Sequence, residues 1–149
     1  IDEHETIYVI AEPSQLDEVV RGLIRVGLDK IEGWFNAGEL KQYEAMVSTS
    51  EVSVQEAQSL LKTSKPYVLD ARRQTEFVEG HLPGAANIAH TRLLSRLKAV
   101  PQDQPILVNC RSGVRSARAC SLLQKHGYNV TNLAGGFLAW EKALAPIER

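Results

Sequence analysis

Residues 105–127 read PILVNCRSGVRSARACSLLQKHG, and this stretch decides the fold. The apolar run Ile106–Asn109 has the length and composition of a buried strand. It leads through the small loop Cys110–Val114 into Arg115–His126, which we expect to be a helix that ends at Gly127. A strand that passes through a tight loop directly into a helix is the first half of a β-α-β unit, in which the two strands are parallel.

The same alternation continues on both sides of this stretch. Upstream, Ser53–Glu56 has the pattern of a capping box that opens a helix to about Leu61, and Tyr67–Asp70 is another buried strand. Further elements are expected as a short helix, a brief strand, a helical segment, a strand and a last helix, at Arg73–Glu79, Ala86–Ala89, Thr91–Leu97, Asn129–Leu133 and Phe137–Leu144. Apolar strands that alternate with helices predict an α/β fold with a parallel sheet covered on both faces.

The N-terminal part repeats a portion of this pattern. Ile7–Ala11 is expected to be a buried strand, and Ser14 can cap a helix that Gly27 ends. The apolar residues of that helix fall at helical spacing, at Leu16, Val19, Val20, Leu23 and Ile24. A polar connector with some helix follows at 36–50.

Matching positions recur about 100 residues apart. Ile7–Ala11 corresponds to Ile106–Cys110. The Leu-Gly pair at 23 and 27 corresponds to the pair at 123 and 127, and Gly33 and Phe35 correspond to Gly135 and Phe137. The alternative is that any two β-α-β units look alike. We therefore predict a partial strand-helix-strand unit with a connector in residues 1–47 and a complete domain in residues 48–149. The apolar face of the first helix must pack on the complete domain or on another copy of the chain.

Composition excludes several classes of function. With 17 Lys and Arg against 18 Asp and Glu, the net charge of −1 gives no basic field for nucleic acid. No apolar run approaches the roughly 18 residues of a membrane span, and the acidic start at 1–6 is unlike a signal peptide. Two cysteines are too few for a disulfide scaffold or a structural zinc site, so we expect a reducing, cytoplasmic location and no cofactor.

The chemistry of the chain centres on Cys110. The expected strand delivers this residue to the carboxyl edge of the sheet, where ligands of open α/β folds bind. The loop of Arg111, Ser112, Gly113 and Val114 can direct several backbone N–H groups toward the sulfur. The helix dipole and the arginines at 111 and 115 favour negative charge there, so the thiol pKa should be lowered. The alternatives are a buried inert cysteine and an ordinary solvated helix face.

Cys120 is interpreted as a core residue. It lies on the following helix beside Ala119 and Leu123, which form a core-facing stripe. Eight helical residues separate it from the loop by roughly 12 Å, and a disulfide to Cys110 would require Cα atoms within about 7 Å.

Three motifs in the right order resemble a rhodanese, or thiosulfate sulfurtransferase, domain over about residues 50–145. They are residues 68–88, with VLDAR, EF, GHLPGA and NI; residues 110–116, CRSGVRS; and residues 132–140, NLAGGF with a final Trp. The resemblance implies a rhodanese-like, open, mainly parallel five-stranded sheet with an appended N-terminal β-α-β fragment. It also implies a persulfide on Cys110.

The resemblance assigns further roles residue by residue. Arg111 and Arg115 would hold the anionic end of a sulfur donor, and the rest of the loop, Ser112, Gly113, Val114 and Ser116, would complete the substrate-binding site. Asp70 and Arg72 match positions that brace the loop or the fold, and His81 is interpreted as structural. The family's Glu-Pro after that arginine is Arg73-Gln74 here, which could add positive charge near the site.

The resemblance also bears on partners and on the alternatives. Residues 7–40 resemble the back half of a degenerate repeat with Ala11 in place of the cysteine, as in fusions with a metallo-β-lactamase-fold domain, so such a domain is an expected fused or docked partner. The substrates would be thiosulfate or a persulfide as donor and a thiol or cyanide as acceptor.

A phosphatase is an alternative function. A phosphatase loop needs five residues between Cys and Arg, and Cys110 and Arg115 enclose four. A non-catalytic binding module is the other alternative.

Overall fold

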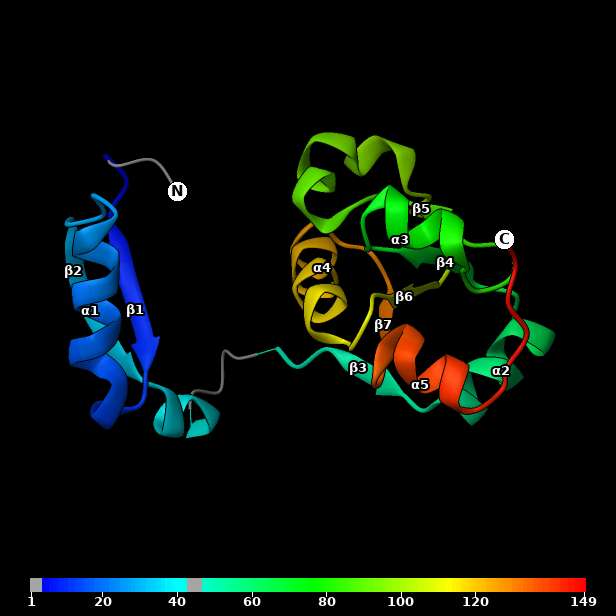
Figure 1. The fold of residues 1–149 in the computed structure, drawn as a ribbon, viewed down its shortest axis with the longest axis horizontal. Helices are drawn as coiled ribbons and strands as arrows, with labels where there is room; N and C mark the ends of the chain where they lie inside the picture. The colour runs from blue at the N-terminus through cyan, green and yellow to red at the C-terminus, as the bar shows by residue number, and fades with distance from the viewer. Residues whose placement is uncertain (1–3, 43–46) are drawn as a thin grey trace. The chain divides into compact units, whose positions relative to one another are not determined.

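A computed structural model describes residues 4–42 and 47–149 of the chain, which divides into two compact units, Ile1–Ser48 and Thr49–Arg149 (Figure 1). We call them unit 1 and unit 2. The connector predicted at 36–50 lies partly outside the described residues. None of the helices in the described ranges combines the length and apolar character that a membrane crossing requires.

Unit 2 is built on a five-stranded sheet with the order β3-β7-β6-β4-β5, in which every neighbouring pair is parallel. Its strands are β3 (Ser50–Val52), β4 (Tyr67–Asp70), β5 (Ala86–Asn87), β6 (Ile106–Asn109) and β7 (Val130–Leu133). The connecting segments are α2 (Val54–Thr63), α3 (Gln74–Glu79), the 3-10 turns η3 (His90–Arg92) and η4 (Leu94–Ala99), α4 (Val114–Lys125) and α5 (Gly136–Lys142). The predicted fold class is confirmed.

Helices cover both faces of this sheet (Figure 1). On one face, α4 packs Cys120 and Leu123 against Ile106 and Val108 of β6. On the other face, α2 and α5 pack against a second cluster that includes Leu107 and the fully buried Trp140. Because β6 is buried on both faces, its sequence is a continuous apolar run, as expected of a central parallel strand.

Local sequence signals explain most of the element boundaries. The capping box predicted at Ser53 is present, since the Ser53 N–H donates to a Glu56 carboxylate oxygen at 2.8 Å and the Glu56 N–H to Ser53 Oγ at 3.3 Å. The expected helix at Thr91–Leu97 is two 3-10 turns instead. Strand β3 was not predicted, because three residues with a single apolar side chain give no periodic signal.

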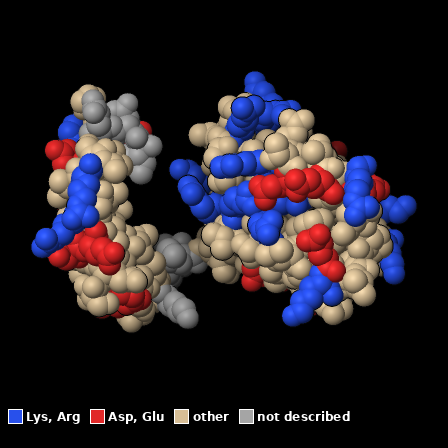
Figure 2. Space-filling view, in the orientation of Figure 1, with Lys and Arg blue, Asp and Glu red and all other residues tan. Residues whose placement is uncertain are grey.

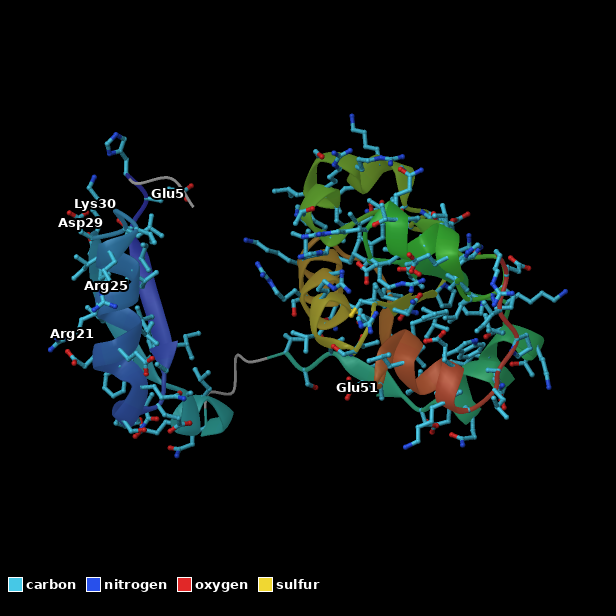
Figure 3. All side chains as sticks on the ribbon, viewed as in Figure 1. Glu5, Arg21, Arg25, Asp29, Lys30 and Glu51 are labelled. Atoms are coloured by element: carbon cyan, nitrogen blue, oxygen red, sulfur yellow. The ribbon has the colours of Figure 1, made fainter. Side chains whose placement is uncertain are left out.

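Unit 1 contains β1 (Ile7–Ala11), the 3-10 turn η1 (Pro13–Gln15), α1 (Leu16–Arg25), β2 (Ile31–Asn36) and the 3-10 turn η2 (Ala37–Gln42). Strands β1 and β2 are parallel, and α1 covers one face of the pair. Arg21 and Arg25 lie on the outer side of α1, away from the strands (Figure 3).

Three expectations for unit 1 are wrong. Strand β1 is only half-buried, because Tyr8 and Ile10 lie on the sheet face that α1 does not cover. Ser14 does not cap α1, since η1 precedes the helix and Gln15 occupies the cap position without a side-chain bond. Gly33 and Phe35 lie within β2 and therefore do not correspond to the start of α5.

Candidate active site

The sulfur of Cys110 lies directly beyond the end of β6, at the start of the loop that leads into α4. The backbone N–H of Gly113 donates to Cys110 Sγ at 3.2 Å. The Ser116 hydroxyl lies 3.3 Å from the same sulfur and 3.0 Å from the Gly113 carbonyl, and it can donate its single proton to either acceptor. Gly113 has a φ of +97°, the left-handed conformation that the sequence predicts. The loop thus surrounds one sulfur atom with hydrogen-bond donors.

These donors favour the ionised form of the Cys110 thiol. Burial is the largest single influence and raises the thiol pKa, since the side chain is fully buried. The Ser116 hydroxyl and the backbone N–H groups of Ser116, Ser112 and Gly113 act in the opposite direction and together lower the pKa below its ordinary value. The loop N–H groups that the sequence predicts to point at the sulfur thus contribute to the lowered pKa, and the Ser116 hydroxyl contributes more than any of them.

The first turn of α5 holds the loop in place from the other side. The Phe137 N–H donates to the Cys110 carbonyl at 2.7 Å, and the Leu138 N–H donates to the Arg111 carbonyl at 3.0 Å. This approach requires glycine at position 136, because a Cβ there would overlap the Cys110 carbonyl oxygen and lie 2.8 Å from the Arg111 carbonyl group. Gly136 also has a φ of +59°, which disfavours any other residue.

Asp70 and Arg72 form a buried ion pair at the end of β4, where the exposed fractions of the two residues are 0% and 3%. Arg72 Nη2 donates to Asp70 Oδ2 and to the Gly80 carbonyl, each at 2.7 Å. The Arg72 guanidinium also lies 4.1 Å from the centre of the Phe137 ring, and the Phe137 N–H binds the Cys110 carbonyl. Arg72 of this pair therefore contacts Gly80, which follows α3, and Phe137, whose N–H binds the Cys110 loop.

Arg115 is paired with Glu76 of α3. The two terminal guanidinium nitrogens donate to the two carboxylate oxygens at 2.7 and 2.8 Å. The hydrogen bond from Arg115 lowers the pKa of Glu76 to about 2. The same bond raises the pKa of Arg115, to which the charge of Cys110 also contributes. An anion at the loop must therefore share Arg115 with Glu76.

The other predicted site residues separate into an inner and an outer set. Gly113 and Ser116 are buried and face the sulfur, whereas the side chains of Arg111, Ser112 and Val114 are exposed. Arg111 is the exposed cation nearest in sequence to Cys110. It can meet an approaching anion, while Ser112 acts through its backbone N–H.

Two residues near the site have structural roles, as predicted. Cys120 belongs to the core cluster under α4, and burial is the main cause that raises its thiol pKa to about 12. The His81 ring stacks on Phe77 with a centroid distance of 3.8 Å, and its Nδ1 lies 3.0 Å from the Phe77 carbonyl. Neither side chain has a hydrogen bond to Cys110 in the described part of the chain.

Three residues that support the loop were not singled out from the sequence: Glu76, Asn132 and Gly136. The Asn132 amide donates to the carboxylate of Glu51 at 2.7 Å and to the Gly113 carbonyl at 3.4 Å. Glu51 lies on β3, at the edge of the sheet (Figure 3). Each of these three residues lies inside one of the motifs at residues 68–88 and 132–140. A single sequence does not show which residue far along the chain each of them contacts.

A parallel sheet that presents a buried cysteine of lowered pKa inside a loop of N–H donors defines a cysteine-centred α/β domain, suited to nucleophilic chemistry or to anion binding. Residues 53–143 match the sequence profile of the Rhodanese-like domain family, and the chain belongs to that family. The match lies wholly within unit 2.

Relatives with sulfurtransferase names are similar to more than half of this chain. A sulfurtransferase of Allochromatium vinosum is 35% identical over 92 residues, which are 61% of this chain and 86% of the relative. The thiosulfate sulfurtransferase GlpE of Vibrio cholerae is 30% identical over 98 residues, which are 65% of this chain and 92% of that protein. The crystal structure of a rhodanese-related protein from Thermoplasma volcanium is 26% identical with a TM-score of 0.63, and the match covers 66% of this chain and 97% of that one.

Proposed function

We propose that the chain is a sulfurtransferase that carries sulfane sulfur as a persulfide on Cys110. The observation that carries this proposal is the pair of hydrogen bonds to Cys110 Sγ, from the Gly113 N–H and the Ser116 hydroxyl, together with the lowered pKa of the thiol. A thiolate, not a thiol, is the nucleophile in such chemistry. The sulfurtransferase names of relatives at 30% and 35% identity support the same reaction class.

The reaction takes two steps. In the first, the Cys110 thiolate attacks the outer sulfur of thiosulfate; a Cys–S–S bond forms, the S–S bond of thiosulfate breaks, and sulfite leaves with the electron pair. In the second, a thiolate or cyanide attacks the outer sulfur of the persulfide, and the Cys110 thiolate leaves. Negative charge resides on sulfur before and after each step, so the loop donors stabilise both forms. Arg111 would attract the anionic donor, and Arg115 would do so in competition with Glu76.

A phosphatase is the weaker alternative. Cys110 and Arg115 enclose four residues rather than five, and the Arg115 guanidinium pairs with Glu76. Both features oppose a cradle that surrounds a tetrahedral phosphate. A binding module without catalysis is the other alternative, and it differs by forming no persulfide.

The test is the intact mass of the whole chain after incubation with thiosulfate. We expect the mass of one added sulfur atom, which cyanide or a thiol removes. Cys110→Ser should gain none, because a hydroxyl is not ionised near neutral pH and forms no persulfide, whereas Cys120→Ser should still gain one. Sulfur loading of the Cys110→Ser chain, or its absence from folded wild-type protein, would overturn the proposal.

For unit 1 we infer the back half of a second rhodanese-like repeat without chemistry of its own. In β1 and β2, Ile7 pairs with Ile31; in β6 and β7, Ile106 pairs with Val130 at the same sequence separation, although the register of β1 and β2 shifts by one residue after Ile7. At the point where unit 2 has its cysteine, unit 1 has Ala11, which cannot carry sulfur.

The turns after the two long helices support the same inference. Gly27 after α1 and Gly127 after α4 both have a φ of +83°. In each turn the next N–H bonds back to a leucine carbonyl, from Leu28 at 3.0 Å and from Tyr128 at 3.1 Å. We propose that this unit is a docking element for a further domain, such as the metallo-β-lactamase-fold domain of the fusions that it resembles. A reducing, cytoplasmic location is part of this proposal, because a Cys110 that reacts as a thiolate must remain unoxidised.

A further inference from the structure

A groove of about 560 Å³ lies between α3 and the segment from β5 to η4. Its lining is partly apolar and includes Phe77 and Ile88, and Asn87 and Thr91 are polar lining residues. Three arginines also line it, Arg73, Arg92 and Arg96. We call this feature the arginine groove.

The positively charged arginines of the groove have no acidic partner among the described residues. The residues that line it include no Asp or Glu, and no described carboxylate forms an ion pair with Arg73, Arg92 or Arg96. Lys and Arg side chains gather over the segment between β5 and β6 at the top of unit 2 (Figure 2). Like charges held together repel one another, and an anion placed among them relieves that repulsion.

The groove opens at the same edge of the sheet as Cys110. Arg73 follows the carboxyl end of β4, and Ala89 and Arg92 follow that of β5, while Cys110 follows that of β6. In the strand order, β4 lies between β6 and β5, so the ends of β6 and β5 are roughly 10 Å apart at about 4.8 Å per strand. In addition, η3 packs against α4, the helix that begins at the loop.

The residues of α3 connect the two places directly. Glu76 pairs with Arg115 at the loop and accepts a hydrogen bond from the backbone N–H of Arg73 at 3.3 Å. Arg73 thus lies three residues before Glu76, which forms the ion pair with Arg115.

We propose that the arginine groove binds the anionic tail, a phosphate or a carboxylate, of a small thiol that accepts sulfur from Cys110. This inference rests on the proposed sulfurtransferase function. Thiosulfate is too compact to reach from the loop into the groove, so the ligand must be a longer molecule whose charge is remote from its sulfur. The acceptor thiolate attacks the outer sulfur of the Cys110 persulfide, a new S–S bond forms in the acceptor, and the Cys110 thiolate leaves with the electron pair of the broken bond.

The test compares acceptor thiols in pairs that differ only in the charge of the tail. Cys110 is loaded with thiosulfate, and transfer is followed to 4′-phosphopantetheine against pantetheine and to glutathione against its diethyl ester. The variant is the triple substitution Arg73→Gln, Arg92→Gln and Arg96→Gln. The matched control is Lys98→Gln, an exposed cation of η4 that does not line the groove.

For the triple variant we expect kcat/KM with a charged acceptor to fall about tenfold or more, through KM, as charge-assisted hydrogen bonds are lost. The neutral partner of that pair, the loading by thiosulfate and the Lys98→Gln control should change less than about twofold. An effect with the phosphate pair alone identifies a phosphate tail, and an effect with the glutathione pair alone identifies carboxylates.

Two results would overturn the proposal: equal losses with the charged and neutral acceptors, or no loss beyond that of Lys98→Gln. Calorimetric binding of both acceptor pairs to the Cys110→Ser chain separates this proposal from the transfer reaction. Preference for the charged member of either pair that the triple substitution removes would support the groove even if no sulfur is transferred. Sulfur transfer without such a preference in either pair would leave the proposed function standing and the groove refuted.

Discussion

The substitution Gly136→Ala tests whether the close contact between α5 and the Cys110 loop is essential. A Cβ at position 136 would overlap the Cys110 carbonyl oxygen and lie 2.8 Å from the Arg111 carbonyl group. Since both contacts are with backbone, no side-chain rotation relieves them. One strand end and one helix start must move apart, and the hydrogen bonds of Phe137 and Leu138 to the loop must lengthen.

The size of the effect follows from three contributions. A residue with a Cβ at a φ of +59° costs about 1 kcal/mol. Displacing packed backbone costs about 1–3 kcal/mol, and two weakened hydrogen bonds cost about 1 kcal/mol each. The expected loss of about 4–6 kcal/mol is a large share of the stability of a typical domain, which is about 5–15 kcal/mol. For a domain of this size the midpoint of thermal unfolding should fall by about 16 °C or more.

Gly84→Ala is the matched control, because Gly84 has a φ of +68° but nothing within 4 Å of its added Cβ. It should cost only about 1 kcal/mol. The assay is thermal unfolding by near-ultraviolet circular dichroism, together with the pH dependence of iodoacetamide modification. Gly136→Ala should also raise the Cys110 pKa, since the loop donors lose their alignment. Equal stability losses in the two variants, with an unchanged thiol pKa, would refute the reasoning.

Three further substitutions test the surroundings of the loop. Ser116→Ala should raise the Cys110 pKa, so the iodoacetamide rate profile moves to higher pH, with a stability loss of about 0.5–1.5 kcal/mol in urea unfolding. Glu76→Gln should destabilise the protein at neutral pH but not near pH 2. The pKa of Glu76 is depressed in the folded state, so its ion pair stabilises the fold above the unfolded-state pKa, and this contribution is lost as the pH falls from 4.5 to about 2. Equal stability losses at both pH values would contradict the assignment. Cys120→Ser should lower stability by about 1–3 kcal/mol, because it buries a hydroxyl, while sulfur loading continues; a folded variant that loads no sulfur would contradict the core role.

The sequence predicts the fold of unit 2 well because its signals are local. A central strand that is apolar on both faces, a capping box at Ser53 and helix-ending glycines each act within a few residues. Strand β3 has three residues and exists because β7 offers an edge to pair with, which is a long-range cause. In unit 1, β1 was expected to be fully buried, but a two-stranded pair with one helix can bury only one face.

The candidate site divides in the same way. Cys110, Gly113 and Ser116 are within one short segment, so a single motif indicates their mutual contact. The partner of Arg115 could not be predicted, because Glu76 is 39 residues away and approaches only when α3 folds over the sheet edge. The need for glycine at 136 arises equally from a segment far along the chain.

The thiolate of Cys110 and the binding of anions depend on different groups of the site. The thiolate of Cys110 is favoured mainly by neutral donors of its own loop, and Arg115 is compensated by Glu76. The thiolate therefore does not depend on the exposed cations for its ionisation. Arg111 and the arginines of the groove are free to take up the charge of incoming anions without altering the nucleophile. Substitution of those arginines should consequently change which molecules deliver or accept sulfur, while the pKa of Cys110 remains unchanged because the loop donors determine it.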